Sequence, residues 1–213
     1  MNRRQILTGL IALPLLAPAP AHAQQPASLT GAARAEALRE ANAALNSQRV
    51  IQGRFLQIAP DGLVTAGRFF LQRPGRVRFE YDPPTRLLIV SDGTTVAVHD
   101  RALRSLNTAR LRATPLYFVL KNDINLERDA HVTRAIRQGD ALFVSARDRR
   151  GEADGEITLH LAGPSLHLRA WDVVDATGGR TRITLTDIQP VAALDQRLFR
   201  VPRPGALNTT APR

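Results

Sequence analysis

Cysteine is absent from this chain of 213 residues, and lysine and tryptophan each occur only once. Without a thiol, the chain cannot form a disulfide, use a cysteine nucleophile or carry a lipid attached to cysteine. Aromatic residues make up 5% of the sequence, so the 44% hydrophobic content is mostly leucine, valine, isoleucine and alanine. The length predicts one domain with a sizeable core.

Long hydrophobic runs are also absent. The run over residues 6–16 is too short to span a bilayer. It follows Arg3 and Arg4 and precedes Ala21-His22-Ala23, an order typical of a secretory signal peptide and its cleavage site. We expect residues 1–23 to be removed during export, leaving a soluble protein outside the cytoplasm. The arginine pair leaves open whether the general or the twin-arginine route is used.

Acidic residues are few relative to basic ones, since 19 Asp and Glu against 29 Lys and Arg give a formal net charge of +10. A basic chain can bind nucleic acid, but the export signal and the scattering of the arginines argue against that class. Two interpretations remain. One is an arginine-rich solvated surface, and the other is a surface that docks on anionic lipid head groups or an acidic partner.

Motifs of hydrolases, nucleotide-binding proteins and metalloproteases are missing too. The sequence has no G-x-S-x-G, no Walker phosphate loop and no H-E-x-x-H, so an esterase would lack a recognisable nucleophile–base pair. His160 and His167 could face each other across the turn at Gly163, but nothing supplies a third metal ligand. Asp92 and Asp100 are typical turn aspartates. The sequence predicts no enzyme activity, no cofactor and no metal.

The sequence does contain a run of alternating residues from 53 to 93. It predicts four strands separated by turns rich in proline, glycine and aspartate, which is typical of an antiparallel meander. Odd positions of the second and third strands share one apolar face, which by default is simply core. These positions are Phe69, Leu71, Val77, Phe79 and Tyr81.

Two helices are expected. In residues 29–47, Leu38, Ala41 and Leu45 fall on one stripe and Thr30 is the expected N-cap. Residues 114–121 form a shorter helix, with Thr114 as N-cap and a proline at the first helical position.

Seven more strands follow the meander, and together the eleven predict a mainly β, α+β domain over residues 24–202, with a tail at 203–213. An antiparallel sheet of this length must curl. We therefore expect a curled, barrel-like sheet whose concave face or mouth is covered by the helices, and whose interior holds side chains or an apolar ligand. The added strands are residues 94–99, 103–107, 128–137, 141–147, 156–161, 166–174 and 181–188.

Arg73 is an anomaly because it lies on the apolar face of the meander. Its side chain could reach solvent beside the Pro74-Gly75 turn, or it could donate to free carbonyls of a helix end at the rim of the interior. The pattern alone favours the solvent-exposed arginine.

Several of these stretches, taken in order with the signal peptide, resemble the LolA family, the periplasmic carriers of outer-membrane lipoproteins. The resemblance covers roughly residues 29–202. It rests on Gly53-x-Phe55-x-Gln57, on residues 67–74 ending in Arg73-Pro74, on Tyr81-x-x-Pro84, on residues 89–93 and on Thr114-Pro115-Leu116.

The resemblance implies an unclosed antiparallel barrel of eleven strands with helices as a lid. It implies a monomeric periplasmic chaperone that shields lipoprotein acyl chains, receives them from an inner-membrane ABC transporter and passes them to a LolB-like outer-membrane acceptor. The lid-holding arginine of the family corresponds to Arg73, which reverses the preference for an exposed side chain. Its cavity aromatics correspond to Phe79 and to Val77, which is smaller here.

Residues from both helices and three strands are expected to line the acyl-chain cavity. They are Leu38, Leu45, Phe55, Phe69, Leu71, Val77, Phe79, Tyr81, Leu116 and Val119. A second hypothesis keeps the same fold but makes the protein a non-enzymatic envelope sensor or scaffold that recognises a protein partner or another lipid.

Overall fold

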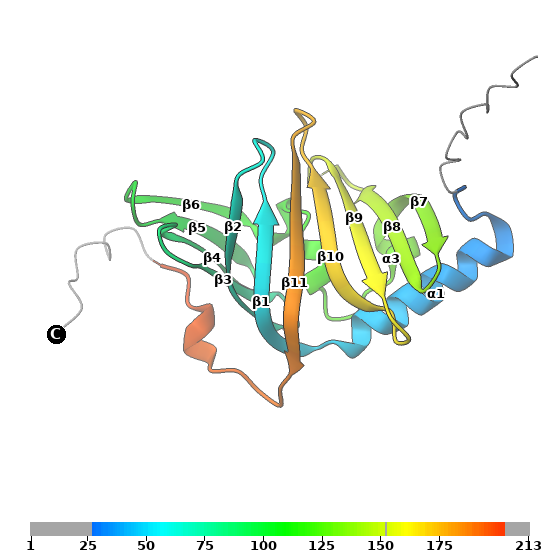
Figure 1. Ribbon diagram of the computed structural model, residues 1–213, viewed down its shortest axis with the longest axis horizontal. Helices are drawn as coiled ribbons and strands as arrows, with labels where there is room; N and C mark the ends of the chain where they lie inside the picture. The colour runs from blue at the N-terminus through cyan, green and yellow to red at the C-terminus, as the bar shows by residue number, and fades with distance from the viewer. Residues whose placement is uncertain (1–26, 152, 203–213) are drawn as a thin grey trace, which may run out of the picture.

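The computed structural model describes residues 27–151 and 153–202. The expected signal peptide (1–23) and tail (203–213) therefore lie outside the described residues. Eleven strands form one antiparallel sheet in the order β6-β5-β4-β3-β2-β1-β11-β10-β9-β8-β7. Because β6 and β7 are its two edges, the sheet is not closed, and the expected mainly β half-barrel is confirmed (Figure 1).

The strands follow the chain as two meanders joined at the centre of the sheet, where β1 pairs with β11. Their bounds are β1 Val50–Ile58, β2 Val64–Gln72, β3 Arg76–Tyr81, β4 Leu87–Asp92, β5 Thr95–Asp100, β6 Ser105–Arg110, β7 Ala130–Gln138, β8 Ala141–Asp148, β9 Glu156–Ala162, β10 His167–Val174 and β11 Arg180–Pro190. The helices are α1 Gly31–Ser47, α2 Tyr117–Leu120 and α3 Leu126–Asp129, with 3-10 turns η1 Leu111–Ala113 and η2 Gln196–Phe199.

The register confirms the shared apolar face of β2 and β3. Phe69 lies opposite Phe79, and Leu71 lies opposite Val77. The side chains of all four are at most 5% exposed. Period-two alternation therefore identified the buried face correctly, because successive side chains of a strand point to opposite faces.

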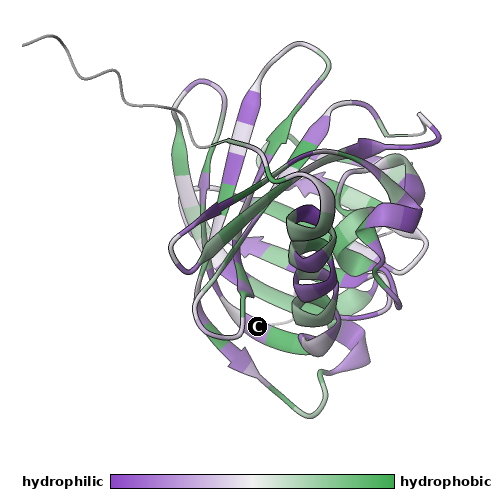
Figure 2. Cartoon of the chain, turned by 90° about the vertical axis from the view of Figure 1, so that its right-hand side faces the viewer, coloured by the Kyte–Doolittle hydropathy of each residue, from purple (hydrophilic) through white to green (hydrophobic). Residues whose placement is uncertain are grey.

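The sheet curls strongly around this face. The rings of Phe79 in β3 and Trp171 in β10 lie 6.2 Å apart, although three strands separate β3 from β10 in the sheet order. Such a contact requires the two halves of the sheet to approach each other across the concave side. Figure 2 shows the strands curving around α1.

One large hydrophobic cluster fills the space between the concave face and the helices, and it takes Leu38 and Leu45 from α1. A second, small cluster of Leu88, Val90 and Ala97 lies apart from it, on the other face of β4 and β5. The chain around η2 packs there, where the carbonyl of Leu198 accepts a 3.0 Å hydrogen bond from Arg78.

The helix boundaries differ from the sequence expectation. The first helix begins at Gly31, and Thr30 makes no capping hydrogen bond with its side chain. The second is a single turn beginning at Tyr117, so Thr114 is not its N-cap, and the hydroxyl of Thr114 instead donates to the carbonyl of Leu111. The expected strand start at Arg128 is wrong, because that residue belongs to α3.

Within the described residues, no helix has the length and apolar character needed to cross a bilayer.

Candidate functional site

Arg73 lies one residue beyond β2 and is only 5% exposed. Its Nε donates to the carbonyl of Val119 in α2 at 2.9 Å, and its Nη1 donates to the carbonyl of Leu45 in α1 at 2.5 Å and to that of Gln48. The last carbonyls of a helix have no partner within that helix. The guanidinium therefore joins the sheet to the C-terminal ends of two helices, and the alternative of a solvent-exposed turn arginine is wrong.

Burial of the guanidinium, together with the nearby charge of Arg49, lowers the pKa of Arg73 to about 10. Arg73 still carries its charge at neutral pH, and the ion pairs of the described residues do not include it. The shift corresponds to about 3 kcal/mol against the charged, buried form. The hydrogen bonds to three carbonyls offset that cost, so this connection is well defined in geometry but modest in net free energy.

The turn that follows Arg73 adds main-chain contacts to the same helix ends. The N–H of Gly75 donates to the carbonyl of Leu120 at 2.7 Å, and the N–H of Arg73 donates to that of Arg49 at 2.8 Å. Gly75 has a φ of 73°, and a Cβ there would lie 2.5 Å from the Cα of Gly93. Glycine at this position thus allows the turn to reach the end of α2.

Two asparagines of α1 hold the segment between α2 and α3. The side-chain amide of Asn46 donates to the carbonyl of Ile124 and accepts from its N–H, both at 2.9 Å. The Oδ1 of Asn42 accepts from the N–H of Leu126 at 2.9 Å. The three helices with residues 121–125 are therefore one hydrogen-bonded unit, which we call the helical cover.

The structure brings all ten expected cavity residues together. Eight are buried within the large cluster, at exposures of 0–5%: Leu38, Leu45, Phe55, Phe69, Leu71, Val77, Phe79 and Val119. Tyr81 and Leu116 are partly buried and pack against it. In this structure these side chains pack under the helical cover, so the interior is closed.

Aromatic rings from β1, β2, β3 and β10 contact one another inside this interior. The ring of Phe55 lies 5.1 Å from that of Phe79 and 5.0 Å from that of Tyr81, both edge to face. Burial raises the pKa of Tyr81 to about 12, and its hydroxyl donates to the side-chain oxygen of Gln57 at 2.6 Å. Tyr81 thus places a hydrogen-bonded polar group at the border of an otherwise apolar surface.

Several residues of this site were not identified from the sequence. Trp171, at 3% exposure, and Leu159, fully buried, come from β10 and β9. Alternation in β9 could have identified Leu159, whereas the register shift between Leu168 and Ala170 breaks the alternation ahead of Trp171. Asn42, Asn46 and Gln48 carried no signal, because their partners lie far away in the sequence.

The two histidines do not face each other. In the pairing of β9 with β10, Ala162 lies opposite His167 and Ala170 lies opposite His160. His160 instead bonds through Nε2 to Asp172, at 3.0 Å. Burial lowers the pKa of His160, although Asp172 opposes the shift. Within the described residues, no three potential ligands cluster in a way that could hold a metal.

The acid of this group is also paired with an arginine. Asp172 accepts two hydrogen bonds from Arg182, at 2.7 and 2.9 Å. Burial alone would raise the pKa of Asp172, but hydrogen bonding to Arg182 and the charge of His160 lower it below its ordinary value.

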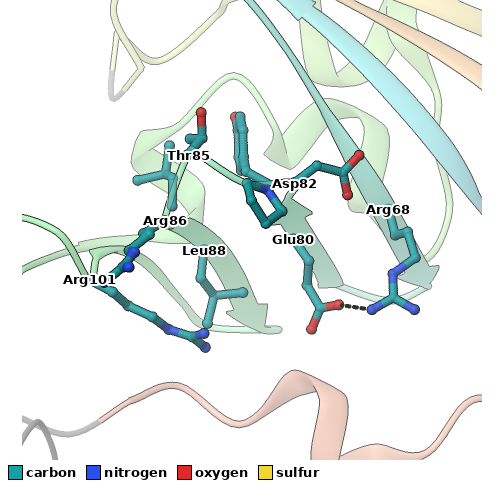
Figure 3. A pocket seen from close by; sticks show the side chains of 10 residues that line it. Arg68, Glu80, Asp82, Thr85, Arg86, Leu88 and Arg101 are labelled. Carbon is teal, nitrogen blue, oxygen red and sulfur yellow. Dashed lines mark hydrogen bonds and ion pairs between the residues drawn. The ribbon is translucent and has the colours of Figure 1, made fainter.

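A surface depression of about 580 Å³ lies at the β3–β4 turn, away from the helical cover. Figure 3 shows Arg86 and Arg101 on one side of it and the Arg68–Glu80 ion pair, at 3.0 Å, on the other. Apart from Tyr81, its lining includes none of the expected cavity residues. This depression is therefore distinct from the closed interior.

Residues 46–202 match the family described as outer membrane lipoprotein carrier protein LolA. A protein of Pseudomonas aeruginosa named outer-membrane lipoprotein carrier protein is 28% identical over 182 residues, which are 81% of this chain and 86% of that protein. One of Methylibium petroleiphilum with the same name is 29% identical over 190 residues, 85% and 92% of the two chains.

Solved structures similar to this chain include a LolA superfamily protein from Nitrosomonas europaea, with 11% identity and a TM-score of 0.46, covering 78% of this chain and 96% of that one. The Pseudomonas aeruginosa MucA/MucB complex contains another, with 16% identity and a TM-score of 0.41, covering 81% and 62%. Because the family match runs from the C-terminal end of α1 through all eleven strands, this chain belongs to the LolA family.

Proposed function

We propose that the protein is a non-enzymatic carrier of the periplasm, which holds the acyl chains of lipoproteins between the helical cover and the concave face of the sheet. It takes them from an ABC transporter of the inner membrane and passes them to a LolB-like acceptor at the outer membrane. One observation carries this proposal. Arg73 is a buried cation that attaches two helices to the sheet, directly over an apolar interior. The relatives' name, lipoprotein carrier protein, supports it.

The closed interior fits a carrier that exchanges its own packing for that of a ligand. An acyl chain can enter only after the helical cover moves away. Each buried methylene stabilises the complex by about 0.8 kcal/mol, so one chain contributes on the order of 10 kcal/mol. Opening breaks the hydrogen bonds of Arg73, and closing restores them. Restored contacts at the cover therefore favour release to the acceptor.

Loading needs energy from outside this chain, because the sequence has no phosphate-binding loop. A transporter that hydrolyses ATP supplies it in this proposal. The carrier itself contributes a protected apolar surface and a cover that opens and closes.

The test compares the wild type with Arg73→Leu, which removes the donor to all three carbonyls. We expect the variant to retain more lipoprotein, detected by mass spectrometry of what co-purifies from the periplasm, and to release it more slowly to outer-membrane vesicles. Arg86→Leu is the control, because Arg86 is exposed and lines the depression at the β3–β4 turn, away from the helical cover. Unaltered release by Arg73→Leu would contradict the proposal. A tightly bound protein without any lipoprotein would favour the sensor or scaffold.

A further inference from the structure

A cleft of about 350 Å³ lies beside α2, bordered by η1, α3 and the end of β8. Its walls include Tyr117 and Phe118 from α2 together with Arg112, Arg149 and Arg150. Three chain segments that are distant in sequence thus bring arginines to one place at the edge of the helical cover.

Other cations of the cleft are already neutralised. Lys121 lies 2.6 Å from a carboxylate oxygen of Asp129, and Arg128 pairs with Asp129 at 2.9 Å and with Asp123 at 3.1 Å. Hydrogen bonds from Arg128 and Lys121 lower the pKa of Asp129 well below its ordinary value, against the effect of burial. Asp129 is therefore charged and already paired with Lys121 and Arg128, so its charge does not offset that of the remaining arginines.

Asp148 also lines the cleft, so the walls carry five cations against the two carboxylates of Asp129 and Asp148. The ion pairs among the described residues do not include Arg112, Arg149 or Arg150. Arg149 donates to two main-chain carbonyls, of Glu127 and Ala130. Arg112 and Arg150 make no hydrogen bond or ion pair within residues 27–151 and 153–202. Guanidinium groups match the geometry of phosphate oxygens, so the cleft has the chemistry of a phosphate site.

The position of the cleft indicates what kind of phosphate it suits. Phe118 lines the cleft, yet its side chain is 5% exposed and belongs to the large interior cluster. The next residue, Val119, offers its carbonyl to Arg73. One helical turn thus lies between the cationic cleft and the apolar interior, a spacing that suits an amphiphile with an anionic head and an acyl tail.

We infer that the cleft binds the phosphate head group of an anionic lipid whose acyl chain occupies the interior. This inference rests on the acyl-chain site of the proposed function and adds a second class of ligand to it, a lipid that is not a lipoprotein. An acidic protein segment would also be attracted by the arginines. The apolar contact through Phe118 favours the lipid, because an acidic segment has no use for the interior.

The experiment measures binding of lysophosphatidylglycerol and of lysophosphatidylcholine with the same acyl chain, each below its critical micelle concentration and at low ionic strength. Trp171 is the only tryptophan and lies 6.2 Å from Phe79 in the interior, so its fluorescence reports the tail. We expect the wild type to bind the anionic lipid about tenfold more tightly, as two exposed charge contacts can provide.

Arg112→Gln/Arg150→Gln should lose this preference and bind the zwitterionic lipid as the wild type does. The matched control is Arg86→Gln/Arg101→Gln, which removes the same charge from the depression of Figure 3 and should keep the preference. Glycerol 3-phosphate, which lacks a tail, should bind at least a hundredfold more weakly than the anionic lipid.

Each of the other possible outcomes would overturn a specific part of the inference. Equal binding of both lipids by the wild type, or a preference that survives in Arg112→Gln/Arg150→Gln, would overturn the head-group site and leave the cleft to an acidic protein segment. Tight binding of glycerol 3-phosphate would mean a site for free phosphate esters. If neither lipid changes the fluorescence of Trp171, the proposed acyl-chain function fails, and the inference fails with it.

Discussion

A single guanidinium organises the site because it presents donors in two directions. Arg73 uses Nε for Val119 in α2 and Nη1 for Leu45 and Gln48 at the end of α1. Lysine carries the same charge on one nitrogen atom and cannot reproduce that fork. The role of Arg73 therefore depends on the shape of its side chain as well as on its charge.

Arg73→Lys should lower the free energy of unfolding by about 1–3 kcal/mol, because at least one of the three carbonyls is left without a donor in a buried place. Urea denaturation followed by circular dichroism measures the change. Arg49→Lys should stay within about 0.5 kcal/mol, as is usual for exposed positions. Equal effects of the two substitutions would show that the fork geometry of Arg73 contributes nothing.

The lowered pKa of His160 predicts that the folded protein loses stability as the pH falls. Its ordinary pKa is 6.5, and burial lowers the pKa in the folded protein. Between the two values the unfolded chain binds more protons, so stability falls as the pH drops below about 6.5. Asp172, whose pKa is also lowered, adds a further loss below about pH 4. The stabilisation that Asp172 provides is fully present above the pKa that this carboxyl group has in the unfolded chain.

His160→Gln should flatten the stability profile just below about pH 6.5, and leave the loss below about pH 4 that Asp172 contributes. Urea denaturation at a series of pH values provides the profile. His131→Gln, at an exposed position of β7, should leave the slope unchanged. A variant at His160 that keeps the wild-type slope would assign the acid sensitivity to other groups.

Elements with a regular period were predictable, and elements fixed by single contacts were not. The β2–β3 register follows from alternating residues such as Phe69 and Phe79, which have only one way to bury their side chains. The last two residues of α3 were expected in a strand, although Asn125 caps this turn by accepting from the N–H of Arg128. An asparagine directly before the helical turn was the available signal.

The residues of the site divide in the same way, into those that a local pattern could place and those that it could not. Apolar side chains such as Leu71 and Val77 could be placed from pattern, since burial follows from alternation. Pattern gave the wrong preference for Arg73, because its partners lie 25 to 46 residues away. Asn46 and Ile124 are 78 residues apart, and no local pattern connects them.

The helical cover should loosen as a unit when its asparagine contact is removed. Asn46→Ala leaves both the N–H and the carbonyl of Ile124 without partners, and Ile124 is 2% exposed. We expect a loss of about 1–3 kcal/mol and faster hydrogen exchange over residues 117–126. Asn107→Ala, at an exposed position of β6, should change neither. Exchange that rises evenly across the whole sheet would contradict a separate cover.

At the scale of the whole molecule, the sheet carries two hydrophobic clusters with different roles in the proposed cycle. In the large cluster, the side chains of the strands must separate from those of the helical cover when a ligand enters, whereas the small cluster around Val90 lies on the other face and stays intact. Contacts of the cover therefore affect both ligand affinity and folding stability, whereas contacts of the small cluster affect folding stability alone. The apparent affinity is reduced by the fraction of molecules that are closed.

Asn46→Ala should therefore bind an acyl chain more tightly although it is less stable. A cover weakened by about 1.4 kcal/mol raises the open population about tenfold and the apparent affinity by up to the same factor. Titration with a lysophospholipid, followed by Trp171 fluorescence, measures the apparent affinity.

Val90→Ala is the matched control, because it deletes fully buried methyl groups in the small cluster and lowers stability by about 1–3 kcal/mol without touching the cover. Its affinity should equal that of the wild type. A rise in affinity for Val90→Ala as well would mean that any loss of stability opens the interior. No rise for Asn46→Ala would mean that the cover does not limit entry.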